Sequence, residues 1–142
     1  QLMSAGSGVT HSEFNPSRSE GTHILQIWIH PHTRGLVPTY TEWHPEEGQV
    51  HPKTLLISPD GREGSATIRQ DASVFRILLE PGEEVVHELA AGRGLWLQAI
   101  HGEIHLNGTR LSPGDGASSE DAGIFRIAAA TEPVEALLFD LA

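Results

Sequence analysis

The chain has 142 residues, no cysteine and a formal net charge of −10. This length predicts one domain with room for an appendage, and it is enough to bury a sizeable core without cross-links. The lack of cysteine excludes disulfides and thiolate metal sites and agrees with a reducing cytoplasmic location. Nineteen acidic against nine basic residues argue against direct nucleic-acid binding. No apolar run reaches the roughly 20 residues of a membrane span.

The first 34 residues differ in composition from the rest. They hold one strong candidate strand, Ile24–Ile29, among many small polar residues, and they cannot bury a core alone. The sequence begins with Gln1, its only methionine is Met3, and no signal-peptide pattern opens it. We therefore expect a chain that is cut, processed or mis-started at its N-terminus. The segment His30–Pro38, with two prolines and a glycine, predicts a linker.

The remainder of the chain consists of short apolar runs that are rich in β-branched or aromatic residues. Glycine, proline, asparagine and aspartate separate these runs, a rhythm typical of short antiparallel strands in a sandwich or barrel. Glu83–Ala91 is the nearest candidate for a helix, but Pro81-Gly82 before it and Gly92 after it favour a strand. The expected strands after the linker are 55–57, 66–68, 74–79, 85–89, 95–100, 104–106, 109–111, 124–128 and 134–139.

One hairpin is predicted with particular force. Asn107-Gly108 stands between the strand-like runs 104–106 and 109–111. A type I′ turn needs positive φ at both central positions, which asparagine and glycine tolerate. In all, the sequence predicts nine or ten strands, enough to close a small barrel, and hence an all-β protein.

Several segments spread along the chain carry a family resemblance. They are MSAGSGVTHSEFNP at 3–16, LQIWI at 25–29, GLVPTY at 35–40, Gln70-Asp71, Trp96-Leu97-Gln98 and LLFDL at 137–141. Together they resemble the pirin family, whose bacterial members include quercetin 2,3-dioxygenase-like enzymes. The resemblance covers essentially the whole chain, and its N-terminal motif is the most specific part.

The resemblance implies a bicupin, in which two cupin-type β-barrels of the double-stranded β-helix or jelly-roll kind lie in one chain. Residues 1–34 would then be the remnant of the first, metal-binding barrel and the start of the linker. Residues 35–142 would form the C-terminal barrel, which we expect to be metal-free.

The resemblance also implies a metal site in the parent protein. The family's ligands are two histidines of an early His-x-His and a later His-x-Glu, and the later pair matches His11 and Glu13. The early pair would precede residue 1. The implied cofactor is a divalent transition metal (iron, nickel, copper, manganese or zinc), among which an imidazole and a carboxylate alone do not choose. Glu13 would also act as general base toward a flavonol hydroxyl.

For the isolated chain the two residues support two interpretations. Their spacing of two would place both side chains on one face of a strand, but two ligands are too few for a good site. We therefore expect His11 and Glu13 to be exposed remnants and the chain to be inactive alone. The alternative is a metal completed by water or by a neighbouring chain.

Other histidines are weaker candidates. His30-Pro31-His32 has the spacing of a ligand pair but lies in the predicted linker. His87 lies where a metal-binding second barrel would place ligands, yet it has no histidine partner at the right spacing, so a hydrogen-bonded core or surface position is favoured. A Ser-His-Asp hydrolase has no nucleophile elbow to support it.

Three functions remain open at this stage. The first is a fragment of a metal-dependent dioxygenase whose parent cleaves flavonols such as quercetin. The second is a non-enzymatic regulatory or protein-binding module, and the third is a barrel that binds a small molecule in its apolar interior.

An apolar strand such as Ile24–Ile29 without its neighbours would expose an edge. We therefore expect it to pack on the second barrel or to pair with another copy of the chain in a homo-oligomer.

Overall fold

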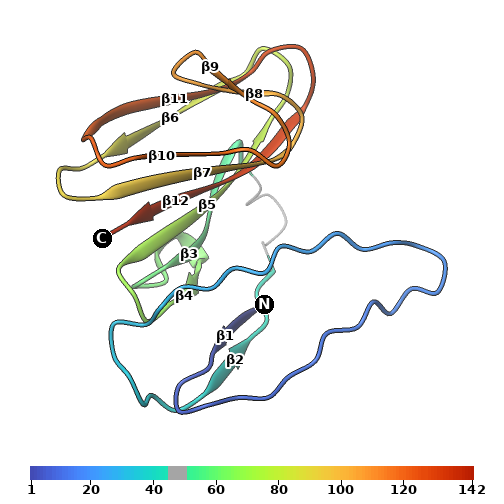
Figure 1. Cartoon of the computed structure of the whole chain (residues 1–142), viewed down its shortest axis with the longest axis vertical. Coiled ribbons are helices and arrows are strands. Elements are labelled where there is room, and N and C mark those ends of the chain that lie inside the picture. The colour runs from blue at the N-terminus through green and yellow to red at the C-terminus, as the bar shows by residue number, and fades with distance from the viewer. Residues whose placement is uncertain (45–50) are drawn as a thin grey trace.

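A computed structural model describes residues 1–44 and 51–142 of the chain. In these residues it contains twelve strands and one short 3-10 helix, arranged as a barrel with an N-terminal segment beneath it (Figure 1). The described part holds no helix with the length and apolarity of a membrane span. The elements are β1 (Leu2–Ser4), β2 (Thr39–Thr41), β3 (Lys53–Ser58), η1 (Arg62–Gly64), β4 (Ala66–Thr67), β5 (Ala72–Leu79), β6 (Glu84–Leu89), β7 (Gly94–His101), β8 (Ile104–Leu106), β9 (Thr109–Leu111), β10 (Gly116–Ser119), β11 (Gly123–Ala129) and β12 (Val134–Leu141).

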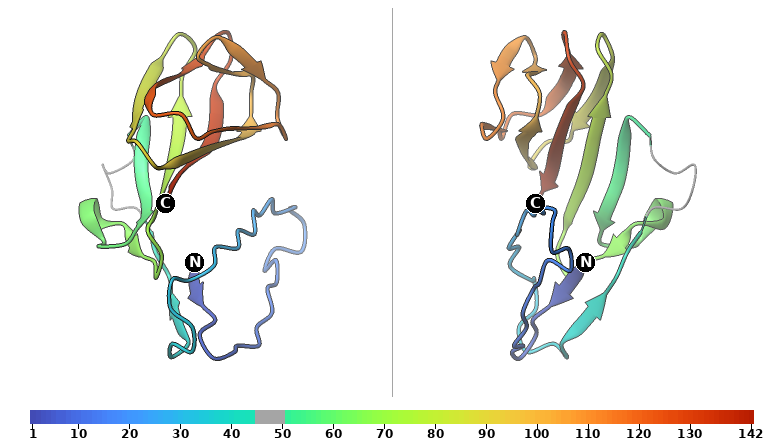
Figure 2. Two further views of the ribbon diagram at one scale, coloured as in Figure 1. Left: turned by 60° about the vertical axis from the view of Figure 1, so that its left-hand side comes forward. Right: turned by 90° about the vertical axis from the view of Figure 1, so that its right-hand side faces the viewer.

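The barrel is built from two sheets that face each other (Figure 2). One has the order β10-β7-β12-β5-β3-β4 and the other the order β6-β11-β8-β9. All neighbouring strands are antiparallel except β3 and β4. This architecture confirms the predicted all-β barrel. Its largest fully buried apolar side chains are Ile77, Leu89, Leu97, Ile104, Ile127 and Leu138.

Strand β12 is apolar on both faces. Val134, Ala136 and Leu138 point into the barrel core, whereas Leu137 and Phe139 belong to a second apolar cluster on the outer face. Alternate residues of a strand point to opposite faces, so a strand that is buried on both sides carries an unbroken apolar run. The outer cluster is covered in part by the N-terminal segment, which packs Ile29 against it.

The predicted hairpin at Asn107-Gly108 is confirmed. Asn107 has φ 48° and Gly108 has φ 82°, and the turn places Leu106 opposite Thr109. The side-chain Oδ1 of Asn107 also accepts the backbone N–H of Arg126 at 2.8 Å. The turn thereby joins the β8–β9 hairpin to β11. The choice of a strand over a helix for Glu83–Ala91 is confirmed as well, since β6 occupies its centre.

The N-terminal segment corrects two expectations. Ile24–Ile29 forms no strand, and neither does the stretch that contains His11 and Glu13. A strand needs a neighbouring backbone for its N–H and C=O groups, and residues 24–29 meet the barrel through side chains instead. The expectation that this segment packs on the barrel is therefore met, while its strand conformation was wrong.

Three short strands were not predicted from the sequence. β1 and β2 pair with each other, with Leu2 opposite Thr41, and β10 pairs with β7. The sequence of β10 is Gly-Ala-Ser-Ser, which has no apolar alternation to detect. Pairing with a long neighbour is what makes it a strand.

A glycine fixes the point where the two halves of the N-terminal segment meet. Gly6 has φ 52°, and a side chain there would collide with the carbonyl oxygen of Leu36. The next residue, Ser7, donates its backbone N–H to that oxygen at 2.9 Å. The loop between residues 8 and 35 therefore leaves and returns at one place, beside the β1–β2 ribbon (Figure 1).

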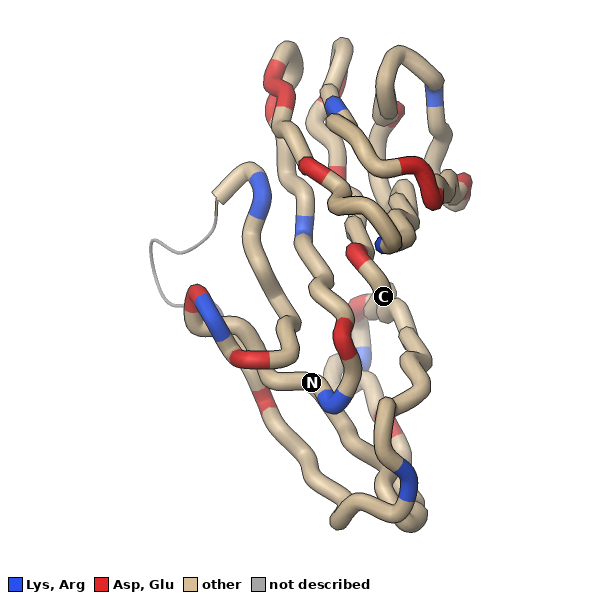
Figure 3. Tube along the Cα trace, turned by 90° about the vertical axis from the view of Figure 1, so that its left-hand side faces the viewer, with Lys and Arg blue, Asp and Glu red and all other residues tan. Residues whose placement is uncertain are grey.

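Charged positions are interspersed along the chain rather than gathered in one block (Figure 3). Several form exposed or half-exposed pairs across neighbouring strands, such as Arg76 with Glu135 at 2.8 Å and Arg126 with Glu84 at 2.7 Å. Exposed pairs of this kind each contribute at most about 1 kcal/mol. They order the surface of the sheets more than they stabilise the fold.

Candidate functional site

The predicted metal ligands lie in the open loop of the N-terminal segment. His11 and Glu13 are both exposed, on irregular backbone, so the argument that a strand places them on one face does not apply. Glu13 lies near Tyr40. The pKa of Tyr40 is raised, first by its hydrogen bond to Glu42, then by partial loss of hydration and the charge of Glu42, and last by the charge of Glu13.

The donor atoms of His11 and Glu13 suit a divalent transition metal, since imidazole and carboxylate are ordinary ligands for such ions. Their number does not suit it. Among residues 1–44 and 51–142, no three histidine, cysteine, aspartate or glutamate side chains lie together in a way that could hold a metal ion. The described residues therefore do not make a metal site by themselves.

The His30-Pro31-His32 pair contacts the barrel. The backbone N–H of His32 donates to the carbonyl oxygen of Arg69 at 2.9 Å, and its Nδ1 lies 2.7 Å from the same oxygen. The carbonyl oxygen of His30 accepts from the side-chain Nε2 of Gln70 at 2.7 Å. The predicted linker is thus fastened to the turn between β4 and β5.

A polar cluster occupies an inward-facing position between the two sheets. His87 of β6 is only 5% exposed. Its Nε2 lies 3.0 Å from Oδ2 of Asp140 on β12, and its Nδ1 lies 3.0 Å from Nζ of Lys53 on β3. We call these three residues, with Arg93 and Asp71, the His87 cluster. This arrangement matches the expectation of a hydrogen-bonded core histidine.

Arg93, in the turn between β6 and β7, binds both carboxylates of the cluster. Its Nε donates to Oδ1 of Asp140, and its Nη2 donates to the backbone oxygen of Asp140 at 3.1 Å. Its Nη1 donates to both carboxylate oxygens of Asp71 at 3.1 Å. These bonds hold the pKa of Arg93 above its usual value, with the Asp140 hydrogen bond as the main cause.

An aromatic ring backs the cluster. The rings of Phe75 and His87 meet edge to face, 5.4 Å apart at 63°, and Nζ of Lys53 lies 4.9 Å from the centroid of Phe75. An ammonium over a ring face is attracted by the ring quadrupole. Phe75 thereby holds the lysine and the imidazole in one geometry.

The bonding pattern fixes the proton of His87. An ammonium group can only donate, so Nδ1 must accept from Lys53, and the proton lies on Nε2, from which it is donated to Asp140. The pKa of His87 is lowered by burial first and by the charge of Lys53 second, against the opposing effect of Asp140. Burial likewise lowers the pKa of Lys53, partly offset by Asp140 and Glu63.

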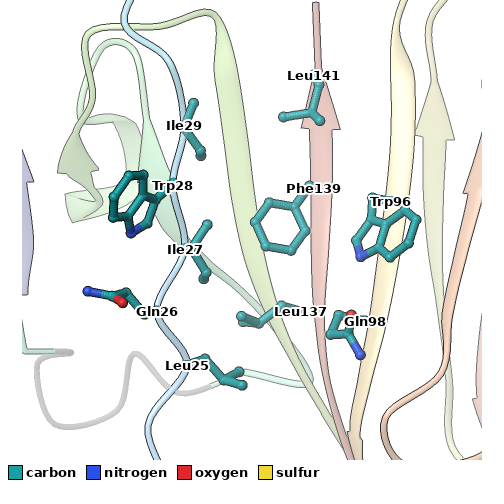
Figure 4. Close-up of a pocket in the computed structure, with 10 residues that line it drawn as sticks. All are labelled: Leu25, Gln26, Ile27, Trp28, Ile29, Trp96, Gln98, Leu137, Phe139 and Leu141. Carbon is teal, nitrogen blue, oxygen red and sulfur yellow. The ribbon is translucent and has the colours of Figure 1, made fainter.

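A second feature is an apolar groove of about 440 Å³ on the outer face of the six-stranded sheet. Figure 4 shows the extended segment with Ile27 and Trp28 on one side and Trp96 of β7 on the other, with Phe139 of β12 between them. Trp28 is 86% exposed and Trp96 is 40% exposed. The groove therefore presents aromatic surface to solvent.

Comparison with known proteins places this chain. Residues 55–141 match the family described as quercetinase C-terminal cupin domain, and residues 1–29 match the family described as pirin. The chain belongs to the pirin family. It is 41% identical over 141 residues to quercetin 2,3-dioxygenase of Escherichia coli K12, covering 99% of this chain and 60% of that protein. It is 35% identical over 144 residues to a pirin-like protein of Caulobacter vibrioides, covering 100% of this chain and 61% of that one.

Solved structures agree with this assignment. YhhW from Escherichia coli matches with a TM-score of 0.75 and 36% identity, over 81% of this chain and 48% of that one. The bacterial pirin YhhW in complex with nickel(II) matches with a TM-score of 0.70 and 36% identity, over 78% and 47%. The barrel is therefore a cupin barrel of the pirin family. The chain spans about 60% of the length of the curated relatives it matches.

Sequence reasoning missed most of the His87 cluster. The sequence pattern identified His87 as a candidate. Asp71 and Asp140 appeared only as members of the segments that resemble the pirin family, and Lys53 and Arg93 belong to no recognised motif. The usable signal was the position of each residue next to apolar residues of the same face: His87 lies between Val85 and Leu89 on β6, and Asp140 lies two residues after Leu138 on β12. A polar residue at such a position needs a partner.

Proposed function

We propose that the chain is the C-terminal part of a metal-dependent oxidoreductase of the quercetin 2,3-dioxygenase type, whose substrate is a flavonol. The observation that carries this proposal is the 41% identity to the Escherichia coli enzyme over 141 residues. The nickel complex of a 36% identical pirin supports a divalent transition metal in the whole protein. The experiment below determines which of iron, nickel, copper, manganese or zinc supports the activity.

The division of the chain follows the same proposal. Residues 1–34 are assigned to the first, metal-binding barrel and the start of the linker, and residues 35–142 to the metal-free C-terminal barrel. Two observations support it. Residues 1–29 match one family and residues 55–141 match another, so the boundary lies between these two ranges in the proposal. Among the described residues, the main core cluster of the barrel consists of residues between 75 and 138, and the loop of residues 8–28 is exposed almost throughout.

In this proposal His11 and Glu13 supply two metal ligands in the whole protein. The remaining metal ligands belong to the part of the whole protein that these 142 residues do not include. Because two ligands are too few to hold the metal, the isolated chain is inactive. Glu13 has a second role as the group that accepts the proton of the flavonol hydroxyl.

The experiment uses the whole parent protein loaded with each metal in turn. Metal content is measured by elemental analysis, and oxygen uptake is measured with quercetin as substrate. We expect His11→Ala to lower both, and Glu13→Gln to lower oxygen uptake by about 100-fold or more, the contribution of a general base. His101→Ala, an exposed histidine on β7, is the matched control. Full metal content and oxygen uptake in both His11 and Glu13 variants would overturn the assignment.

The alternative function is a non-enzymatic module that binds another protein chain, and the groove favours it. Trp28, Ile24 and Phe14 are large apolar side chains that lie more than half exposed on the N-terminal segment. Monomeric soluble proteins rarely expose a large continuous apolar surface. We propose that a second copy of the chain covers Ile24–Ile29 and the groove, giving a homo-oligomer.

A further inference from the structure

The two sheets of the barrel are joined by polar side chains where no strand pairing joins them. β3 and β12 belong to the six-stranded sheet and β6 to the four-stranded sheet. Lys53 crosses from β3 to β6, where its Nζ donates to Nδ1 of His87 at 3.0 Å and to the carbonyl oxygen of Val86 at 2.9 Å. Asp140 crosses from β12 to the other ring nitrogen of His87. We call this junction the seam.

Charged groups face His87 from several elements of the barrel. Lys53 faces it from β3, Asp140 from β12, and Arg93 from the turn before β7. Asp71 lies behind Arg93, and β5 and β11 offer only phenylalanines, Phe75 by ring contact and Phe125 as the strand partner. Lys53 and Asp140 flank the ring directly, Arg93 and Asp71 form the next pair, and Glu63 of η1 acts on Lys53 from farther away. One more proton on the ring would place a second cation beside the Lys53 ammonium in a largely buried place.

That proton would also have no acceptor. Nδ1 of His87 is the only ring nitrogen without a proton, and the group in front of it is the ammonium of Lys53. A proton on Nδ1 would turn the 3.0 Å hydrogen bond into a contact between two donors that carry like charges. Asp140 cannot relieve this contact, because it lies on the far side of the ring and already accepts from Arg93.

We propose that His87 is a pH-sensitive latch that closes the seam between β3 and β6 when its imidazole is neutral and opens it when the imidazole is protonated. Protonation expels the ammonium of Lys53 from Nδ1 and from the carbonyl of Val86. β3 then keeps only its pairing with β5 and β4. The opening exposes the partly buried Phe75 and Val85, which pack against the barrel core on either side of the seam.

The latch is also connected to the N-terminal segment. Arg93 binds Asp71, the backbone N–H of Asp71 donates to Oε1 of Gln70 at 2.8 Å, and Nε2 of Gln70 donates to the carbonyl of His30. A continuous series of hydrogen bonds thus runs from the seam to the end of the segment that lines the groove. If protonation of His87 also affects the N-terminal segment, the change should be detected first at residues 69–71.

The test is nuclear magnetic resonance of the full chain with ¹⁵N-labelled histidine between pH 8 and pH 5. At pH 8 we expect His87 to carry its proton on Nε2, and its titration midpoint to lie below the usual value for histidine. Amide exchange, corrected for its intrinsic pH dependence, is followed in parallel. We expect protection in Lys53–Ser58 and Glu84–Leu89 to fall about tenfold for each unit by which the pH drops below that midpoint, while β8 and β9 stay protected.

Two variants separate a latch from a merely buried histidine. Lys53→Met keeps the apolar stem but removes the ammonium, and we expect it to raise the His87 midpoint and to remove the acid-induced loss of protection. His87→Gln keeps a donor and an acceptor but does not titrate, and we expect it to hold the seam closed at pH 5.

Three results would overturn the proposal. They are a proton on Nδ1 at pH 8, titration of His87 without loss of protection in β3 and β6, and an acid-labile seam in the His87→Gln chain. The first two are read from the unmodified chain, so the proposal stays falsifiable where a variant does not fold.

Discussion

The indole of Trp96 on β7 lies directly over Gly116 on the neighbouring strand β10, so close that a methyl group at position 116 would overlap the ring. The contact explains how a half-exposed tryptophan keeps a fixed position beside the apolar groove. It also gives a reason for glycine at the start of a strand, where this residue otherwise weakens the structure.

Replacing Gly116 with alanine should therefore destabilise the barrel. Overpacking of a well-packed contact costs about 1–3 kcal/mol, and here either the indole or β10 must move. The free energy of unfolding from urea titration measures the loss, and tryptophan fluorescence reports the displaced ring. Gly94→Ala is the control, because a side chain at Gly94 meets no atom within 4 Å. Equal stability of the two variants would contradict the packing argument.

The β8–β9 turn should depend on Asn107 in two separable ways. Asn107→Ala removes both a residue that tolerates positive φ and the oxygen that accepts the N–H of Arg126, so we expect a loss of about 1–3 kcal/mol in unfolding free energy. Asn107→Gly keeps the conformation and loses only the acceptor, so its loss should be smaller. Thermal unfolding of both variants checks the order, which would be reversed if the turn conformation were unimportant.

Acid should destabilise the fold through His87. Its pKa in the folded chain is lowered below the usual value near 6.5, so the unfolded chain binds a proton more readily. The contribution to stability is complete above about pH 6.5 and is lost as the pH falls from there toward the folded pKa. We expect the urea midpoint of the unmodified chain to fall more between pH 7.5 and pH 5.5 than that of His87→Gln. Parallel curves would show that the lowered pKa of His87 has no effect on stability.

The exposed groove should make the chain self-associate. We expect light scattering after size-exclusion chromatography to show a mass that rises with concentration. Trp28→Ser should weaken the association by about tenfold or more, as expected for a tryptophan at the centre of an interface. Val86→Ser removes an exposed apolar residue of β6 outside the groove and should leave it unchanged. A monomer at all concentrations would refute the homo-oligomer.

The candidate metal ligands show a limit of pattern reading. Their spacing predicts a shared face only if the backbone is a strand, and at His11 and Glu13 it is irregular. The same holds for Ile24–Ile29, whose composition favours a strand but whose backbone meets no partner strand in the described chain. A hydrogen-bonded ladder is a property of two segments, so one segment cannot determine it.

The amino-acid sequence by itself determined what depends on neighbouring residues. Asn107-Gly108, which tolerates positive φ, determined a hairpin, and the short apolar runs between turn residues determined where most strands of the barrel lie. Only the tertiary structure decided that Lys53, His87 and Asp140 meet, since 34 and 53 residues separate His87 from its partners. Sheet order brings such distant residues together, because it decides which strands lie opposite each other across the barrel.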